Sequence, residues 1–181
     1  MENIYYRKLK PPVQLVSPSW ESNISGVCEM IMTNDMINNE VHEWLQDLGL
    51  SIERPRCLFK GAGRQGGLHI DCQTPVGNNF ARLNWVFGGQ GSKIEWFELL
   101  PGKTASKAIN YVNEEINIYN ENDCQQVCTS EINGLYVINT GIPHRVTSGL
   151  TDRFCYALFL NSKNGRVEWP EATEMLRDFI V

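Results

Sequence analysis

The sequence lacks a long hydrophobic run, an excess of basic charge and more than three histidines. No apolar stretch approaches the ~20 residues of a membrane-spanning helix. The N-terminal segment MENIYYRKLKPP has no apolar core of the kind found in secretory signals. We therefore expect a soluble, cytoplasmic protein. The net charge is −5, whereas tight nucleic-acid binding needs a dense Lys/Arg surface, so a nucleic-acid partner is not expected.

The six cysteines form no C-x-x-C pair. This argues against a zinc site built from paired cysteines and favours free thiols in a reducing compartment. A chain of 181 residues that is 42% hydrophobic has the composition of an ordinary globular protein. We expect a single domain over residues 1–181, and the sequence gives no indication of its oligomeric state.

Hydrophobic periodicity predicts the order helix, β-rich core, helix. Residues 1–33 are expected to form an N-terminal arm, which prolines keep extended. A helix is expected over 34–49, where apolar residues recur at helical spacing after a Thr33 or Asn34 cap. A second helix is expected over 169–180, with Pro170 in its first turn.

The segment between the helices, residues 52–161, is expected to be an all-β core. It contains eight short runs rich in β-branched and aromatic residues, separated by Gly, Pro, Asn and Asp. Runs of this kind at close spacing favour a barrel or a double-sheet jelly roll, that is, a cupin-like double-stranded β-helix. The polar segment 102–123 is expected to leave this core, either as a surface loop or as a lid.

Two of the three histidines, together with one aspartate, form a candidate metal site. His69 and Asp71 are two residues apart in GLHID, so they share one face of a strand. His144 lies far downstream, and a jelly roll brings distant strands side by side. Two imidazoles and one carboxylate on one side of a metal are the ligand set of non-haem Fe(II) oxygenases. Taken alone, an H-x-D pair is also compatible with a structural histidine beside a turn carboxylate.

A second candidate feature is Arg153, which opens the apolar strand RFCYALFL nine residues after His144. A guanidinium that points inward on such a strand is costly without an anion, and it matches a carboxylate with two parallel hydrogen bonds. The alternative is an arginine at the rim of the core, paired with an acid such as Asp152.

These residues, in this order, resemble the Fe(II)- and 2-oxoglutarate-dependent oxygenases. The pattern of that family is H-x-D, then a distal His, then an Arg about ten residues later. Here it reads His69-Ile70-Asp71, His144 and Arg153. The resemblance covers roughly 61–161, and the chain looks most like small members from phage and bacterial genomes.

The resemblance implies an activity and a set of roles. His69, Asp71 and His144 would bind Fe(II), and Arg153 would pair with the carboxylate of 2-oxoglutarate that is remote from the iron. With 2-oxoglutarate and O2 as cosubstrates, a peptidyl, amino-acid or small-metabolite substrate would be hydroxylated, and succinate and CO2 released.

Two further residues, Arg82 and Asn84, share a face of the strand FARLNWVF. Both are candidates for binding the cosubstrate, and the alternative for Arg82 is a solvated charge. One departure from the family concerns Cys155, which stands where many members have a serine that also contacts the cosubstrate.

Two other functions remain open at this point. A cupin-like metal-dependent isomerase or lyase usually has H-x-H followed by Glu, which this chain lacks. A non-catalytic jelly-roll binding module would use the histidines structurally. Arg153 separates these alternatives, because only the oxygenase needs an arginine at that place.

Overall fold

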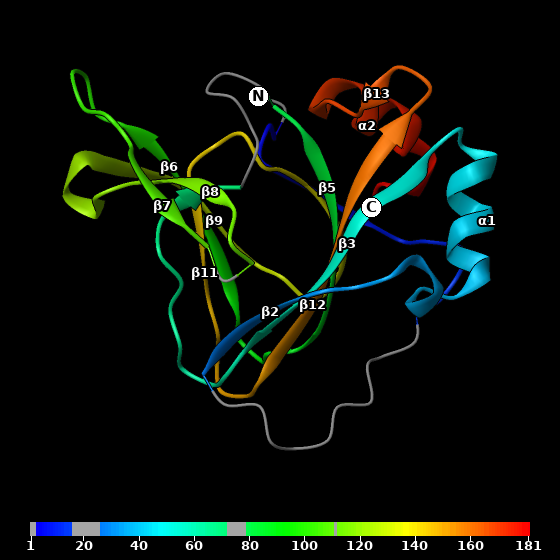
Figure 1. Ribbon diagram of the computed structural model, residues 1–181, viewed down its shortest axis with the longest axis horizontal. Coiled ribbons are helices and arrows are strands. Elements are labelled where there is room, and N and C mark those ends of the chain that lie inside the picture. The colour runs from blue at the N-terminus through cyan, green and yellow to red at the C-terminus, as the bar shows by residue number, and fades with distance from the viewer. Residues whose placement is uncertain (1–2, 16–25, 72–78, 111) are drawn as a thin grey trace.

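The computed structural model describes residues 3–15, 26–71, 79–110 and 112–181. These residues form two antiparallel β-sheets and two α-helices, and both helices lie beside the larger sheet (Figure 1). The prediction of a mainly β chain with flanking helices is confirmed. Within the described part of the chain, no helix is long and apolar enough to span a membrane.

The larger sheet runs in the order β1-β10-β5-β12-β3-β2, with β13 paired to β12. Its strands are β1 (Tyr6–Leu9), β2 (Val27–Ile31), β3 (Ser51–Lys60), β5 (Ala81–Gly88), β10 (Gly134–Asn139), β12 (Arg153–Ser162) and β13 (Gly165–Arg166). The smaller sheet runs in the order β7-β8-β4-β11-β6-β9. Its strands are β4 (His69–Ile70), β6 (Lys93–Leu99), β7 (Ser106–Ile109), β8 (Glu115–Ile118), β9 (Cys124–Glu131) and β11 (His144–Thr147).

The first helix is shorter than the predicted span 34–49. Ile37 is extended (φ −101°, ψ 128°) and separates a 3-10 turn, η1 (Asn34–Met36), from α1 (Asn39–Asp47). Asn38, rather than Thr33 or Asn34, occupies the N-cap position of the α-helix. The helix ends before Gly49, whose positive φ of 72° suits a C-terminal stop.

The second helix is likewise divided. The predicted span 169–180 contains α2 (Trp169–Met175), which has Pro170 in its first turn as expected, and a 3-10 turn, η3 (Arg177–Phe179). Leu176 (φ −98°, ψ 4°) lies between the two. Both helices bury apolar side chains against the larger sheet.

The predicted N-terminal arm and the predicted excursion both contribute strands. Within 1–33, β1 pairs with β10 and β2 pairs with β3, so the β-structure begins well before residue 52. Residues 16–25 of the arm lie outside the described part. Within 102–123, β7 and β8 form a hairpin, and β8 pairs with β4. Another 3-10 turn, η2 (Glu121–Asp123), follows that hairpin. The hairpin therefore extends the smaller sheet beside the H-x-D strand.

Strand alternation gives the larger sheet two different faces. Its outer face packs against α1 and α2 in an apolar cluster that includes Leu83, Leu158 and Leu160. Its inner face contributes to a second apolar cluster with residues of the smaller sheet, such as Val86 with Trp96. Buried polar side chains of both sheets meet between them and form the candidate site.

Candidate metal and anion site

The structure brings the two histidines of the candidate site together. His144 opens β11 and lies directly opposite His69 of β4 in the antiparallel register. Their ring centroids are 4.9 Å apart. One ligand atom from each of His69, Asp71 and His144 lies within 4.8 Å of the others. The two strands that carry the distant parts of the motif are therefore hydrogen-bonded neighbours.

Backbone carbonyls orient both rings. The Nδ1 atom of His69 is 2.8 Å from the carbonyl oxygen of Gly67, and the Nδ1 atom of His144 is 2.9 Å from that of Ile142. A carbonyl can only accept, so each Nδ1 carries the proton and donates. In the neutral ring, Nε2 then presents a lone pair, which is the usual state of a metal-binding histidine held by an outer partner.

Asp71 follows β4 directly and is only 6% exposed. Its Oδ1 lies 3.4 Å from Nε2 of His69 and 3.8 Å from Nε2 of His144. Its Oδ2 lies 2.9 Å from Nη1 of Arg82, an ion-pair contact whose angle is not that of a hydrogen bond. Burial would raise the pKa of Asp71, but the charge of Arg82, with the two histidines, holds it well below its ordinary value. Asp71 is therefore an ionised carboxylate.

The donor set fits a divalent metal ion. Burial lowers the pKa of His144 to about 4, against the opposing effect of Asp71, so its ring is neutral at pH 7. Ligands ~2.0–2.2 Å from a metal and at right angles to one another are about 3 Å apart. The contacts of 3.4 and 3.8 Å are close to that spacing, so modest side-chain rotation would complete the site. Three protein ligands would leave other coordination positions open.

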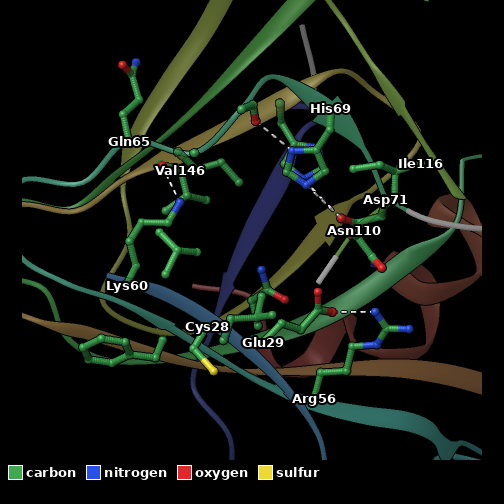
Figure 2. A pocket seen from close by; sticks show the side chains of 18 of the residues that line it. Cys28, Glu29, Arg56, Lys60, Gln65, His69, Asp71, Asn110, Ile116 and Val146 are labelled. Atoms are coloured by element: carbon green, nitrogen blue, oxygen red, sulfur yellow. Dashed lines mark hydrogen bonds and ion pairs between the residues drawn. The ribbon is translucent and has the colours of Figure 1, made fainter. Parts of the chain in front are cut away.

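These residues line a cavity of about 470 Å³ between the two sheets. Figure 2 shows His69 and Asp71, from the smaller sheet, on one side of the cavity and Lys60, Cys28 and Glu29, from the larger sheet, across from them. The volume is in the range of sites that bind small molecules. The hairpin β7–β8 also contributes lining residues, so the segment predicted as a loop or lid forms one wall of the cavity.

Arg153 lies on the same cavity and is only 2% exposed. It has no hydrogen-bond or ion-pair partner in the described part of the chain, and its Nε is buried and unsatisfied. Asp152, the alternative partner, instead accepts a hydrogen bond from the backbone N–H of Ala62 at 2.9 Å. A buried guanidinium without an anion is costly, so this side chain is suited to bind one.

Lys60 adds a second cation beside Arg153. The two residues are opposite each other in the β3–β12 register, and Lys60 donates from Nζ to the carbonyl oxygen of Val146 at 2.7 Å. Burial and the charge of Arg153 lower the pKa of Lys60 to about 8. Two like charges share this end of the cavity, which strengthens the case for an anionic ligand.

The other predicted residues also lie in the cavity. Arg82 and Asn84 are both buried and line it, so Arg82 is not a solvated strand charge. Arg82 donates from Nε to Oδ1 of Asn84 at 3.3 Å as well as contacting Asp71. Its contacts therefore lie on the metal side of the cavity. Cys155 is fully buried in the inner apolar cluster and is not among the cavity-lining residues.

Sequence reasoning missed Lys60, Glu29 and Arg56, which also line the cavity. Lys60, Leu58 and Arg56 alternate along β3, so period-two spacing predicts that they share a face. Which face points inward depends on the pairing of β3 with β12, and the sequence does not give that pairing. Glu29 comes from the segment predicted as an arm.

No protein-family model matches the sequence, and neither does any curated protein. Among solved structures, the chain is similar to the X-ray structure of Escherichia coli ycfD, with a TM-score of 0.36 and 12% sequence identity. The match covers 63% of this chain and 27% of that one, so the chain spans about a quarter of its length. A likeness this slight transfers no function.

Proposed function

We propose that the protein is an Fe(II)- and 2-oxoglutarate-dependent oxygenase that hydroxylates a small-molecule or peptide substrate. The observation that carries the proposal is the buried Arg153, which has no partner among the described residues and shares a cavity with the His69–Asp71–His144 cluster. A set of three metal-ligand residues alone fits many metalloproteins. A set of metal-ligand residues with a buried guanidinium in the same cavity fits a small molecule that binds the metal at one end and presents a carboxylate at the other.

We further propose that the fold is a double-stranded β-helix. From β3 to β6, successive strands alternate between the larger and the smaller sheet, and they alternate again from β9 to β12. The four strands β10-β5-β12-β3 thus face the four strands β4-β11-β6-β9. This winding supports the jelly-roll assignment, and the three metal-ligand residues would lie between the sheets at one end.

In the proposed reaction, a C–H bond of the substrate becomes C–OH, while 2-oxoglutarate and O2 yield succinate and CO2. One oxygen atom of O2 enters the substrate and the other enters succinate. Bound Fe(II) would supply the redox chemistry that activates O2. His69, Asp71 and His144 would hold it.

The remaining residues would orient the cosubstrate and tune the site. Arg153 would bind the remote carboxylate with two parallel N–H donors, and the Lys60 ammonium would lie beside it. Arg82 keeps Asp71 ionised and restrains its second oxygen. The carbonyls of Gly67 and Ile142 fix the ring orientations, so the ligand set is arranged before any metal arrives.

Neither alternative accounts for Arg153. A cupin-like isomerase or lyase needs the metal ligands but no unpartnered arginine beside them. A non-catalytic jelly-roll module needs neither. No observation in the described residues favours either one specifically.

Anaerobic spectroscopic titration tests the proposal. Fe(II) and 2-oxoglutarate added together are expected to produce a weak visible charge-transfer absorption that neither produces alone. Asp71→Ala should abolish it. Glu121→Ala, a control at an exposed acid outside the cavity, should leave it unchanged. A folded protein that binds Fe(II) but gives no absorption with 2-oxoglutarate would contradict the proposal.

A further inference from the structure

The end of the cavity formed by β2 and the β7–β8 hairpin carries a carboxylate, Glu29 of β2. Its side chain is 12% exposed, and Oε1 accepts a hydrogen bond from Nη1 of Arg56. Figure 2 shows the second carboxylate oxygen pointing into the cavity, on the side of His69 and Asp71. That oxygen has no hydrogen-bond partner among the residues that the structure describes.

Arg56 is shared between two carboxylates. Its Nη2 lies 2.6 Å from Oε2 of Glu114, on the turn of the β7–β8 hairpin. Glu114 has a second cation nearby, since Nη1 of Arg54 lies 3.9 Å from its Oε1. For Glu29, Arg56 is the one cation in contact among the described residues. Because Arg56 is shared in this way, its contact with Glu29 is to Oε1, and Oε2 remains able to accept a hydrogen bond from a ligand.

The cavity is thus polarised along β3. Lys60 and Arg56 point the same way but are four residues apart, so about 13 Å of strand separates them. The Lys60 end also carries Arg153 and suits an anion. The Arg56 end carries Glu29 and suits a cation, and Ile109, Ile116 and Ile118 form an apolar wall there. A second buried polar group lines the cavity: Asn84, 3% exposed, whose amide nitrogen has no hydrogen-bond partner within the described ranges.

We propose that Glu29 binds a cationic group of the substrate, a primary ammonium or a guanidinium, and that the three isoleucines contact the aliphatic chain that carries it. The substrate class is therefore a basic amino acid, free or within a peptide. This inference rests on the proposed function for the identity of the cavity as an active site. It extends that function, because it assigns to the substrate the end of the cavity remote from Arg153.

Paired probes that differ only in charge test the assignment. L-Arginine carries a guanidinium where L-citrulline carries a neutral urea of nearly the same shape. Ligand-observed NMR on the protein without metal or cosubstrate measures both dissociation constants independently of any turnover. We expect arginine to bind roughly tenfold or more tightly than citrulline, because a hydrogen bond to a charged group is stronger than one between neutral groups.

Glu29→Gln should remove that preference, and Glu115→Gln should retain it. Glu115 is an exposed acid on β8 that pairs with Lys107 and is not among the cavity-lining residues, so it is a matched control. A second readout needs no variant: added salt should weaken binding of arginine more than binding of citrulline, because the two share their α-ammonium and α-carboxylate groups and differ in the side-chain charge. Equal binding of the two probes, no binding of either, or an unchanged preference in Glu29→Gln overturns the assignment.

The outcome is distinguishable from failure of the proposed function. A charge preference that depends on Glu29, in a protein that shows no joint absorption with Fe(II) and 2-oxoglutarate, would retain the cation site and reject the oxygenase. Joint absorption without the charge preference would retain the oxygenase and reject the substrate class.

Discussion

The two faces of the larger sheet are built from the same strands, but buried charged side chains of the candidate site lie on only one of them. On the outer face of β12, Tyr156, Leu158 and Leu160 pack against the layer that contains α1 and α2. On the inner face, the alternate positions begin with Arg153, and β5 adds Arg82 and Asn84 from the same side. The outer face buries an apolar cluster, and the inner face buries charged side chains beside a second, smaller apolar cluster.

The difference separates stability from binding. Burial of apolar side chains is the main favourable contribution to folding, so the outer face stabilises the protein. Buried charges contribute little to stability or oppose it unless they are fully paired. The inner face therefore carries side chains whose position is best explained by a ligand. Substitutions in the cavity should therefore change the affinity for metal or anion, whereas substitutions on the outer face should change the free energy of unfolding and leave those affinities in place.

The largest effect is expected for Asp71→Ala, at the wall of the cavity that the smaller sheet forms. Loss of a direct ligand should weaken divalent-metal binding by more than the ~10–100-fold that loss of an outer partner costs. The variant should also lose stability, because Arg82 is left as a buried, unpaired cation. Calorimetric titration with Fe(II) under anaerobic conditions and thermal melting measure the two effects.

The double variant Asp71→Ala/Arg82→Met separates those two effects. Stability should recover toward that of the parent protein, because both partners of the pair are gone, while metal binding should stay lost. Recovery of metal binding in the double variant would show that Asp71 is not a ligand.

Leu158→Ala tests the outer face. Leu158 is fully buried against the helix layer, so its truncation should cost ~2–5 kcal/mol of the free energy of unfolding. Affinity for metal and for 2-oxoglutarate should stay within about twofold of the parent value in the folded protein, because additivity holds for independent sites. Urea denaturation gives the first quantity and calorimetry the second. A large loss of affinity would mean that the two faces are coupled.

Lys60→Met is expected to have the smallest effect, and a pH-dependent one. The pKa of Lys60 in the free protein is lowered to about 8, so its positive charge is present below that pH and is lost as the pH rises through it. Binding of 2-oxoglutarate to the metal-loaded parent protein should therefore weaken between pH 7 and pH 9. Lys60→Met should bind a few-fold more weakly at pH 7 and show a flatter profile. The same pH dependence in both proteins would remove Lys60 from the anion site.

The sequence predicts those site residues that follow from a local pattern and misses those that depend on long-range strand pairing. His69 and Asp71 share a face because strand alternation is local, and His144 joins them because β4 and β11 pair. The role of Arg153 as a candidate anion-binding residue is predicted from its place at the start of an apolar strand. Lys60 depends on the pairing of β3 with β12, a long-range contact that no local pattern reveals.

The fold shows the same division. The sequence predicts the mainly β core and the helix-flanked order correctly, whereas its predicted element boundaries differ from those of the structure. The extended backbone of Ile37 shortens the first helix, although the apolar spacing around it is helical. β2, which carries Glu29, lies at an edge of the sheet within the segment predicted as an arm, because its short sequence VCEMI gives a weak strand signal between polar segments.

The most direct test of the central claim is anaerobic calorimetric titration of 2-oxoglutarate into the Fe(II)-loaded parent protein, Arg153→Ala and Arg153→Lys. Removing one partner of a buried charge pair typically costs ~2–5 kcal/mol, so Arg153→Ala should bind 2-oxoglutarate at least tenfold more weakly. Arg153→Lys should recover only part of that loss, because an ammonium cannot donate two parallel hydrogen bonds. Fe(II) affinity should be similar in all three proteins. Unchanged 2-oxoglutarate affinity in Arg153→Ala would contradict the account.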